Sequence, residues 1–169
     1  LDECRDVASF EESVVVACMS VRPNTGKMHH HQSKVPHLAR FALARALVSR
    51  SKGIQKAVRR GLDFHGYHEG VGKLARPIEG IGIMTIYDVS VRTGGWLGIS
   101  PEKVYLHAGC RLGAKRLGLD VRGREWLEVE EFPEPLSSMP ADELEDFLCA
   151  HLAVFGKSYQ ELKEEGWPI

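Results

Sequence analysis

The side chains best suited to chemistry in this sequence are histidines, and they are concentrated in the first half of the chain. Six of the eight histidines lie between positions 29 and 68, and three are consecutive, His29 to His31, followed by Gln32. Neutral imidazole is a common zinc ligand, but no acidic residue or cysteine is close enough in sequence to complete a ligand set, so no metal site is expected here. A solvated loop is the simpler interpretation. The functional alternative is a loop in which His29, His31 and Gln32 contact phosphate or substrate.

A second set of candidate catalytic residues follows in the middle of the chain: Asp88, Tyr105 and His107. Asp88 and Arg92 are four residues apart, a spacing typical of a salt bridge on a helix surface. In the functional alternative, Asp88 is the carboxylate partner of His107 in acid-base catalysis. Tyr105 can stack on or hydrogen-bond a base, or it can pack in a helical core.

Residues 78 to 86 carry the one pattern that indicates a partner. Their sequence, Ile-Glu-Gly-Ile-Gly-Ile-Met-Thr-Ile, fits the helix-hairpin-helix pattern apolar-x-Gly-apolar-Gly-x-x-Thr-apolar. Gly80 and Gly82 lack a Cβ, so the turn can take positive φ and a phosphate can approach the backbone. The amides from Gly82 to Thr85 would open a helix toward that phosphate, which predicts DNA-backbone binding without sequence reading. The alternative is an ordinary tight loop before a helix.

The segment after this turn extends the pattern. Val104, His107 and the Arg-Leu-Gly at 116–118 match the segment that follows the hairpin in endonuclease III-type DNA glycosylases, the helix-hairpin-helix-GPD superfamily. Residues 64–119 resemble that family. The resemblance implies a helical, DNA-facing scaffold and a place in DNA repair.

The same resemblance argues against the usual glycosylase chemistry. Tyr105 stands where the family has its essential Asp, and Met84 stands where the lyase subfamily has a Lys inside the hairpin. One extra residue lies between His107 and Arg111. The four-cysteine iron-sulfur signature is absent, so no cofactor is expected.

Charge is strongly segregated along the chain. Residues 22–76 contain twelve Lys and Arg against two acids, whereas residues 123–169 contain three against twelve, and the whole chain carries a net charge of −1. Such asymmetry is typical of a basic face that binds nucleic acid, although the two parts can also neutralise each other in the fold. Lys73, Arg76 and Arg111 are the predicted phosphate contacts, with Gly80, Gly82 and Thr85 in the hairpin.

Helices must position the hairpin from both sides. The pattern predicts a first hairpin helix over 64–75 and a second over about 83–93, ended by Gly94 and Gly95. Upstream, Ser9 and Glu12 form a capping box for a helix over about 10–20.

The helix after Pro36 is predicted to be amphipathic. Leu38, Phe41, Ala42, Ala44, Leu47 and Val48 would face the core, and Arg40, Arg45 and Arg50 would face solvent. Gly53 would separate it from a shorter helix over 54–60.

Downstream of the hairpin, Ser100 to Glu102 reads as another helix start and Gly118 as its end. Residues 120–139 read as irregular, with a short strand at 126–129, and a long last helix would run from Pro140 to near Gly156. The predicted fold is therefore all-α, one compact domain over 1–169, with the helix-hairpin-helix at about 64–95 and an acidic helical segment at about 123–169.

The four cysteines are too scattered for a metal or redox motif, which favours free thiols in a reducing compartment. No apolar run is long enough to span a bilayer, so a soluble, cytoplasmic protein without a membrane partner is expected. The preferred function is non-specific DNA binding. One alternative is a divergent glycosylase or nucleotide-directed hydrolase using Asp88, Tyr105, His107 and the loop at 29–32. Another is a non-catalytic regulatory protein that docks a partner through the acidic segment.

Overall fold

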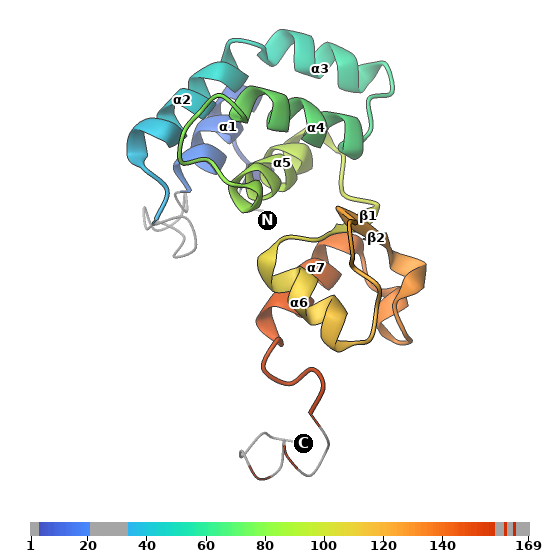
Figure 1. The fold of residues 1–169 in the computed structure, drawn as a ribbon. Coiled ribbons are helices and arrows are strands. Elements are labelled where there is room, and N and C mark those ends of the chain that lie inside the picture. The colour runs from blue at the N-terminus through green and yellow to red at the C-terminus, as the bar shows by residue number, and fades with distance from the viewer. Residues whose placement is uncertain (1–3, 21–33, 158–160, 162–163, 165–169) are drawn as a thin grey trace. The chain divides into compact units, whose positions relative to one another are not determined.

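The structure is a computed structural model that describes residues 4–20, 34–157, 161 and 164. The described residues are mostly helical, as expected, with one short two-stranded sheet in addition. The chain divides into two compact units, Leu1–Pro101 and Glu102–Ile169 (Figure 1). We had expected a single domain. Two units form because the apolar residues sort into two separate buried clusters, one in each unit.

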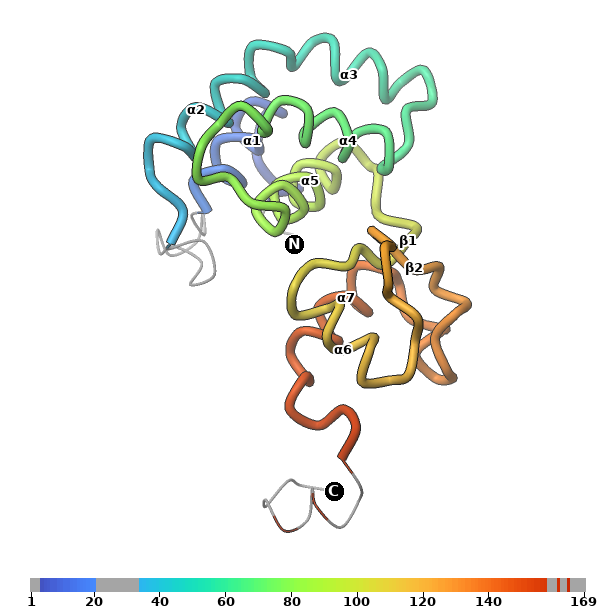
Figure 2. Tube along the Cα trace, viewed as in Figure 1, coloured from blue at the N-terminus to red at the C-terminus, as the bar shows by residue number. Residues whose placement is uncertain are grey.

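The part of the first unit that the structure describes contains five helices. They are α1 (Phe10–Met19), α2 (His37–Val48), α3 (Ser51–Arg59), α4 (Phe64–Ala75) and α5 (Ile83–Leu97). Helix α1 packs against α2 and α5, and α4 packs against α5 and α2. The path of the chain through these helices can be followed in Figure 2.

Helix α1 begins and ends as its sequence dictates, and its end is held by two arginines from elsewhere. The Ser9 side chain accepts a hydrogen bond from the Glu12 amide at 3.1 Å, which confirms the predicted cap. Ser20 ends the helix in the left-handed region, with φ of 53°. The Arg40 guanidinium donates to the Met19 carbonyl at 3.1 Å. The Arg92 guanidinium donates to the Ala17 carbonyl, two residues earlier, at 3.4 Å, and both cations offset the partial negative charge of the helix end.

This contact overturns the predicted face of α2. Arg40 was expected in solvent, but its side chain is buried, whereas Leu38 is 80% exposed and Phe41 is 56% exposed. The buried face is formed by Ala39, Arg40, Leu43, Ala44 and Leu47. Only Leu47 and Ala44 of the predicted apolar stripe are fully buried, because the long-range contact with α1 sets the rotation of α2.

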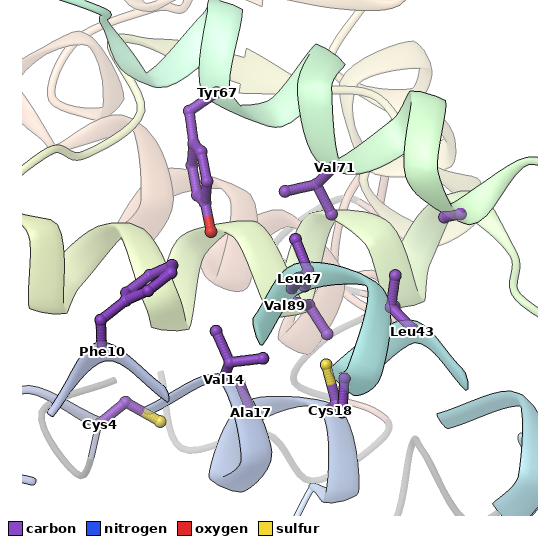
Figure 3. Packing of buried hydrophobic residues seen from close by; sticks show 12 residues of the cluster. Cys4, Phe10, Val14, Ala17, Cys18, Leu43, Leu47, Tyr67, Val71 and Val89 are labelled. Atoms are coloured by element: carbon purple, nitrogen blue, oxygen red, sulfur yellow. The ribbon is translucent and has the colours of Figure 1, made fainter. Parts of the chain in front are cut away.

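The core of the first unit lies between α1, α2, α4 and α5, as Figure 3 shows. Its fully buried side chains include Phe10, Val14, Leu43, Leu47 and Val89. Aliphatic and aromatic side chains removed from water in this way supply the main stabilisation of the unit.

Three glycines act differently from the prediction. Gly53 lies inside α3, and the break from α2 falls instead at Ser49 and Arg50. Gly94 and Gly95 do not stop α5, which continues to Leu97 and ends at Gly98 with φ of 74°. At Gly94 a Cβ would lie 3.3 Å from the Phe64 ring, so this glycine permits close packing of α5 on α4.

The second unit is a small α/β arrangement. Its elements are β1 (Lys103–Tyr105), α6 (Ala108–Arg116), β2 (Trp126–Glu128), the 3-10 turns at Val129–Glu131 and Leu136–Ser138, and α7 (Ala141–Ala150). The strands pair antiparallel, with Val104 opposite Leu127, and α6 and β1 pack on α7. The strand expected at 126–129 is present.

Two predictions for this unit are wrong. No helix begins at Ser100 to Glu102, because residues 103–105 pair with β2 instead. The last helix ends at Ala150 rather than near Gly156, and hydrogen-bonded turns follow it. The acidic segment 123–169 is therefore helical only in part.

All four cysteines are free thiols, as predicted. None of the helices in the described part of the chain has the length and hydropathy needed to cross a bilayer.

Candidate functional site

Helices α4 and α5 form an antiparallel pair joined by the turn at 76–82. Near the start of α4, the Tyr67 hydroxyl lies 2.7 Å from Thr93 Oγ1 in the last part of α5. Near the end of α4, a Cβ on Gly72 would lie 3.9 Å from the Ile86 side chain, in the first turn of α5. The first helix has the predicted bounds, 64–75, and begins at Asp63, whose carboxylate accepts from the Gly66 amide.

The turn between these helices is tight and is fixed by α2. The Ile78 amide donates to the Ala75 carbonyl at 2.9 Å, which ends α4. Gly80 then has φ of 87°, in the left-handed region that glycine tolerates. A Cβ at Gly80 would lie 3.0 Å from Cδ of Pro36 at the start of α2. The sequence predicted a glycine conformation here, but not the residue that packs on it.

Gly82 is the N-cap of α5 and leaves the helix start open. It has φ of −96° and ψ of 171°, and no side chain of the described residues caps the helix. Among those residues, no heavy atom beyond the chain neighbours lies within 4 Å of the position that a Cβ would take there. The backbone amides of Ile83 and Met84 therefore begin the helix at a point where a ligand can approach the main chain. These amides and the helix dipole form the usual arrangement of an anion site.

The side chains of that first turn divide between solvent and core. Ile83 is 68% exposed and Met84 is 43% exposed, whereas the Thr85 side chain is buried. Thr85 is therefore covered by the fold, and its role as a phosphate contact stays a prediction. Two large apolar side chains thus flank the open amides.

The charge around the turn is mixed. Lys73 and Arg76 are exposed, and Lys73 Nζ lies 3.6 Å from Glu69 Oε2 one turn earlier. Glu79 is exposed within the turn itself. The basic excess lies in the rest of this unit, where residues 1–101 carry fourteen Lys and Arg against nine acids.

Arg111 does not fit the predicted role of a phosphate contact. Its guanidinium donates to the Val121 and Arg124 carbonyls at 2.6 Å each, and to the Leu106 carbonyl at 3.1 Å. These three backbone carbonyls take three of the five N–H donors of the guanidinium. Arg111 therefore organises the loop after α6, and we remove it from the phosphate-binding set.

The three candidate catalytic residues are divided between the two units. Asp88 lies on α5 of the first unit, with Oδ2 at 4.0 Å from the buried Arg92 guanidinium. Tyr105 belongs to β1 of the second unit, is buried, and tilts against the Trp126 ring with centroids 6.4 Å apart. A pairing of Asp88 with His107 stays a prediction. His29, His31 and Gln32 lie outside the described residues.

The carboxylate next to His107 is Glu145. His107 is the N-cap residue of α6, and its Nε2 lies 2.6 Å from Glu145 Oε1 on α7, with both side chains buried. The Cys149 thiol donates to the same oxygen at 3.1 Å. His107, Glu145 and Cys149 thus form a polar cluster inside the second unit, which we call the His-Glu-Cys cluster.

Close packing of α6 on α7 makes this cluster compact. A Cβ at Gly109 would lie 3.0 Å from Cys149 Sγ, and one at Gly113 would lie 2.9 Å from the Leu148 carbonyl. Burial and the neighbouring Glu145 carboxylate raise the pKa of Cys149 to about 12, so the thiol is protonated at neutral pH. A thiol in this state is a poor nucleophile.

Sequence reasoning missed Glu145 and Cys149. Their four-residue spacing on a helix was a usable signal, because such positions share one face. Their partner His107 lies 38 residues before Glu145, and it comes close to Glu145 and Cys149 only because α6 packs against α7.

Another histidine, the partly buried His68, lies on α4 in the first unit. Its Nδ1 is 3.0 Å from the Ser90 hydroxyl on α5, and its ring stacks on Phe64. Burial lowers the pKa of His68 to about 4. The side chain is therefore neutral at pH 7 and acts as a link between α4 and α5.

The first unit also contains an apolar cavity of about 370 Å³ between α3 and α4. Leu47, Ile54, Leu62, Val71 and Leu74 contribute to its walls, and Arg50 contributes the charged group.

Comparison with known proteins adds no relative: no family model, no curated protein and no solved structure matches this chain.

Proposed function

We propose that the first unit is a helix-hairpin-helix module that binds the phosphate backbone of DNA, without reading base sequence. The observation that carries this proposal is the start of α5: its N-cap is Gly82, and within the described ranges no side chain caps the helix or fills the space beside Gly82. A phosphate oxygen placed there would accept hydrogen bonds from two or three backbone amides and meet the positive end of the helix dipole.

Two further features support the proposal. Gly80 packs against Pro36, so the turn has a fixed shape and loses little conformational entropy when it binds. The unit has an excess of five positive charges over its 101 residues, counted as Lys and Arg minus Asp and Glu. A cationic protein gains affinity for DNA by releasing the counterions condensed on the duplex.

The enzymatic alternative has less support. It requires Tyr105 and His107 to meet a substrate, but Tyr105 is 7% exposed and His107 is 5% exposed. The carboxylate next to His107 is Glu145, 2.6 Å from its Nε2, and this contact has no counterpart in the resemblance to glycosylases. We therefore propose binding rather than base excision as the function.

The decisive test places an acidic side chain at the N-cap of α5. In Gly82→Asp the carboxylate would accept from the amides that the phosphate needs, because Gly82 already has the extended backbone of an N-cap. Stability should stay equal or rise, while affinity for duplex DNA should fall at least tenfold in fluorescence anisotropy. A misfolded variant would lose both stability and affinity for DNA, so unchanged or raised stability together with lower affinity cannot arise from misfolding.

Two controls separate capping from charge. Gly82→Asn supplies the same cap without a negative charge and should weaken binding less than Gly82→Asp. Arg122→Gln removes an exposed cation that pairs with Asp120 in the second unit, and it should leave binding unchanged. If Gly82→Asp binds duplex DNA as the unmodified protein does, or the unmodified protein fails to bind at low salt, the proposal is wrong.

A salt series tests the flanking cations. Lys73→Gln and Arg76→Gln should each reduce the slope of log affinity against log salt by about 1, since each removes one phosphate contact. Glu79→Gln should tighten binding, because it removes the acidic group of the turn. Parallel titrations with single-stranded DNA and duplex RNA would identify the preferred nucleic acid.

A further inference from the structure

The His-Glu-Cys cluster combines three different donor atoms in the interior of a small unit. Nε2 of His107, a carboxylate oxygen of Glu145 and Sγ of Cys149 all lie within 4.8 Å of one another. His107 and Glu145 are about 95% buried, and Cys149 is partly buried. No metal was expected from the sequence, where these residues are far apart.

We propose that this cluster is a binding site for a zinc-like divalent cation, with His107, Glu145 and Cys149 as its three protein ligands. An imidazole, a carboxylate and a thiolate are all ordinary zinc ligands. The thiolate and imidazole disfavour Mg²⁺ and Ca²⁺, which prefer oxygen alone. A water molecule would complete four-coordination.

The spacing of the donors suits such an ion after a small adjustment. Tetrahedral zinc with its usual bond lengths places ligand atoms roughly 3.3–3.8 Å apart. Cys149 Sγ and Glu145 Oε1 are 3.1 Å apart, and His107 Nε2 and Glu145 Oε1 are 2.6 Å apart. Entry of the ion would spread the His107–Glu145 pair by roughly 0.7 Å or more to reach that spacing.

The packing of α6 on α7 brings the Cys149 sulfur to the other two donors. Residue 109 is glycine, and a Cβ there would lie 3.0 Å from Sγ, so the glycine permits this position of the sulfur. A divalent cation stabilises the thiolate form of a cysteine that coordinates it. When the ion binds, the Cys149 S–H bond breaks, an Sγ–metal bond forms and the proton passes to solvent.

The size of the second unit gives the ion a structural purpose. The unit is 68 residues long, and its described core is built around short elements, two strands of three residues and helices of nine and ten. Domains below about 70–80 residues often need a metal or disulfides in addition to their core. The cluster joins the start of α6 to the middle and end of α7, so an ion there would hold these two helices together.

The test uses Co²⁺ as a probe that reports its own ligands. The full-length protein, freed of metal by chelation, is titrated with Co²⁺, and sulfur-to-cobalt charge-transfer absorption is recorded. One equivalent should produce this absorption, and Zn²⁺ should abolish it by displacement. Cys149→Ser should remove it, and His107→Gln and Glu145→Gln should each weaken Co²⁺ binding at least tenfold.

Two controls give the result its specificity. Cys110→Ala removes a buried thiol one turn from the start of α6 and should keep the absorption. Replacing His29, His30 and His31 by Gln removes consecutive imidazoles that can bind cobalt by themselves, and this variant should also keep it.

Hydrogen exchange of the unmodified protein provides a readout that does not depend on any variant folding. Zn²⁺ should slow amide exchange at the start of α6 and along α7. Absence of charge-transfer absorption in the unmodified protein would overturn the proposal and leave the cluster as a buried polar contact between α6 and α7. Persistence of the absorption in Cys149→Ser, or its equal loss in Cys110→Ala, would overturn the ligand assignment.

Discussion

Alanine substitutions at Gly80 and Gly82 should have different effects on the stability of the first unit. At Gly80, φ is 87°, a left-handed conformation that costs a residue with a Cβ about 1–2 kcal/mol. The new Cβ would also lie 3.0 Å from Cδ of Pro36, which adds repulsion, because the Pro36 ring cannot rotate away. The lower entropy of the unfolded chain returns about 0.4–1 kcal/mol. The net destabilisation should be about 1–3 kcal/mol.

At Gly82 the same change meets no obstacle. The backbone is extended and no heavy atom lies within 4 Å of the Cβ position. Alanine is a poorer N-cap than glycine by about 0.5–1 kcal/mol, and the unfolded-state term offsets a similar amount. Gly82→Ala should therefore stay within about 0.5 kcal/mol of the unmodified protein.

The measurement must report on the first unit alone, because two units with separate cores can unfold in separate transitions. Urea titration with hydrogen exchange read on peptides from α4 and α5 meets this requirement. Equal stability of Gly80→Ala and Gly82→Ala would refute the reasoning, since it would mean that residue 80 neither adopts positive φ nor packs on Pro36.

Three other perturbations test separate parts of the fold. Burial lowers the pKa of His68 to about 4 from 6.5. As pH falls through 6.5, His68 therefore binds a proton in the unfolded chain but stays neutral in the folded unit. The first unit should lose roughly 2 kcal/mol between pH 7 and 4 after allowance for partial exposure, and His68→Gln should flatten this loss in urea titrations. Arg92→Met should cost about 2 kcal/mol because it removes a buried guanidinium that donates to the Ala17 carbonyl near the end of α1. Arg45→Met, at an exposed position of α2, should cost less than about 0.5 kcal/mol; similar costs for both would contradict the role of Arg92. Gly113→Ala should destabilise the second unit by about 1–2 kcal/mol in thermal unfolding, because its Cβ would lie 2.9 Å from the Leu148 carbonyl. A stabilised variant would mean that helix propensity dominates there.

Local signals in the sequence were sufficient for the elements whose ends are defined by short-range chemistry. Ser9 caps α1 through the amide three residues later, and Gly61 ends the helical segment before α4 with φ of 96°. Such signals involve residues within one turn of each other, so a single sequence contains them in full.

Features that depend on tertiary contacts could not be read in the same way. Arg40 is buried because its guanidinium meets the Met19 carbonyl, 21 residues earlier, and this contact turns Leu38 outward. Strand β1 forms because residues 126–128 pair with it. Without that partner, Ser100 and Pro101 looked like the start of a helix.

The same distinction between local signals and tertiary contacts applies to the candidate sites. Gly80 and Gly82 could be singled out because the proposed hairpin pattern is contiguous in sequence. Gly80 has positive φ, whereas Gly82 has φ of −96°. The His-Glu-Cys cluster was not identifiable, because it joins an N-cap on α6 to one face of α7. Arg111 was misjudged for the opposite reason: its charge suggested a ligand, whereas backbone carbonyls of its own unit surround it.

The two glycines of α6 also bear on the order in which the second unit folds. A nine-residue helix is too short to persist alone in water, and Gly109 and Gly113 each weaken it further, by about 1 kcal/mol relative to alanine. These same glycines allow α7 to approach closely enough to compensate. Helix α6 should therefore form only as it docks on α7, so that His107 reaches Glu145 at a late step of folding, and a peptide covering residues 106–119 should be unstructured by circular dichroism.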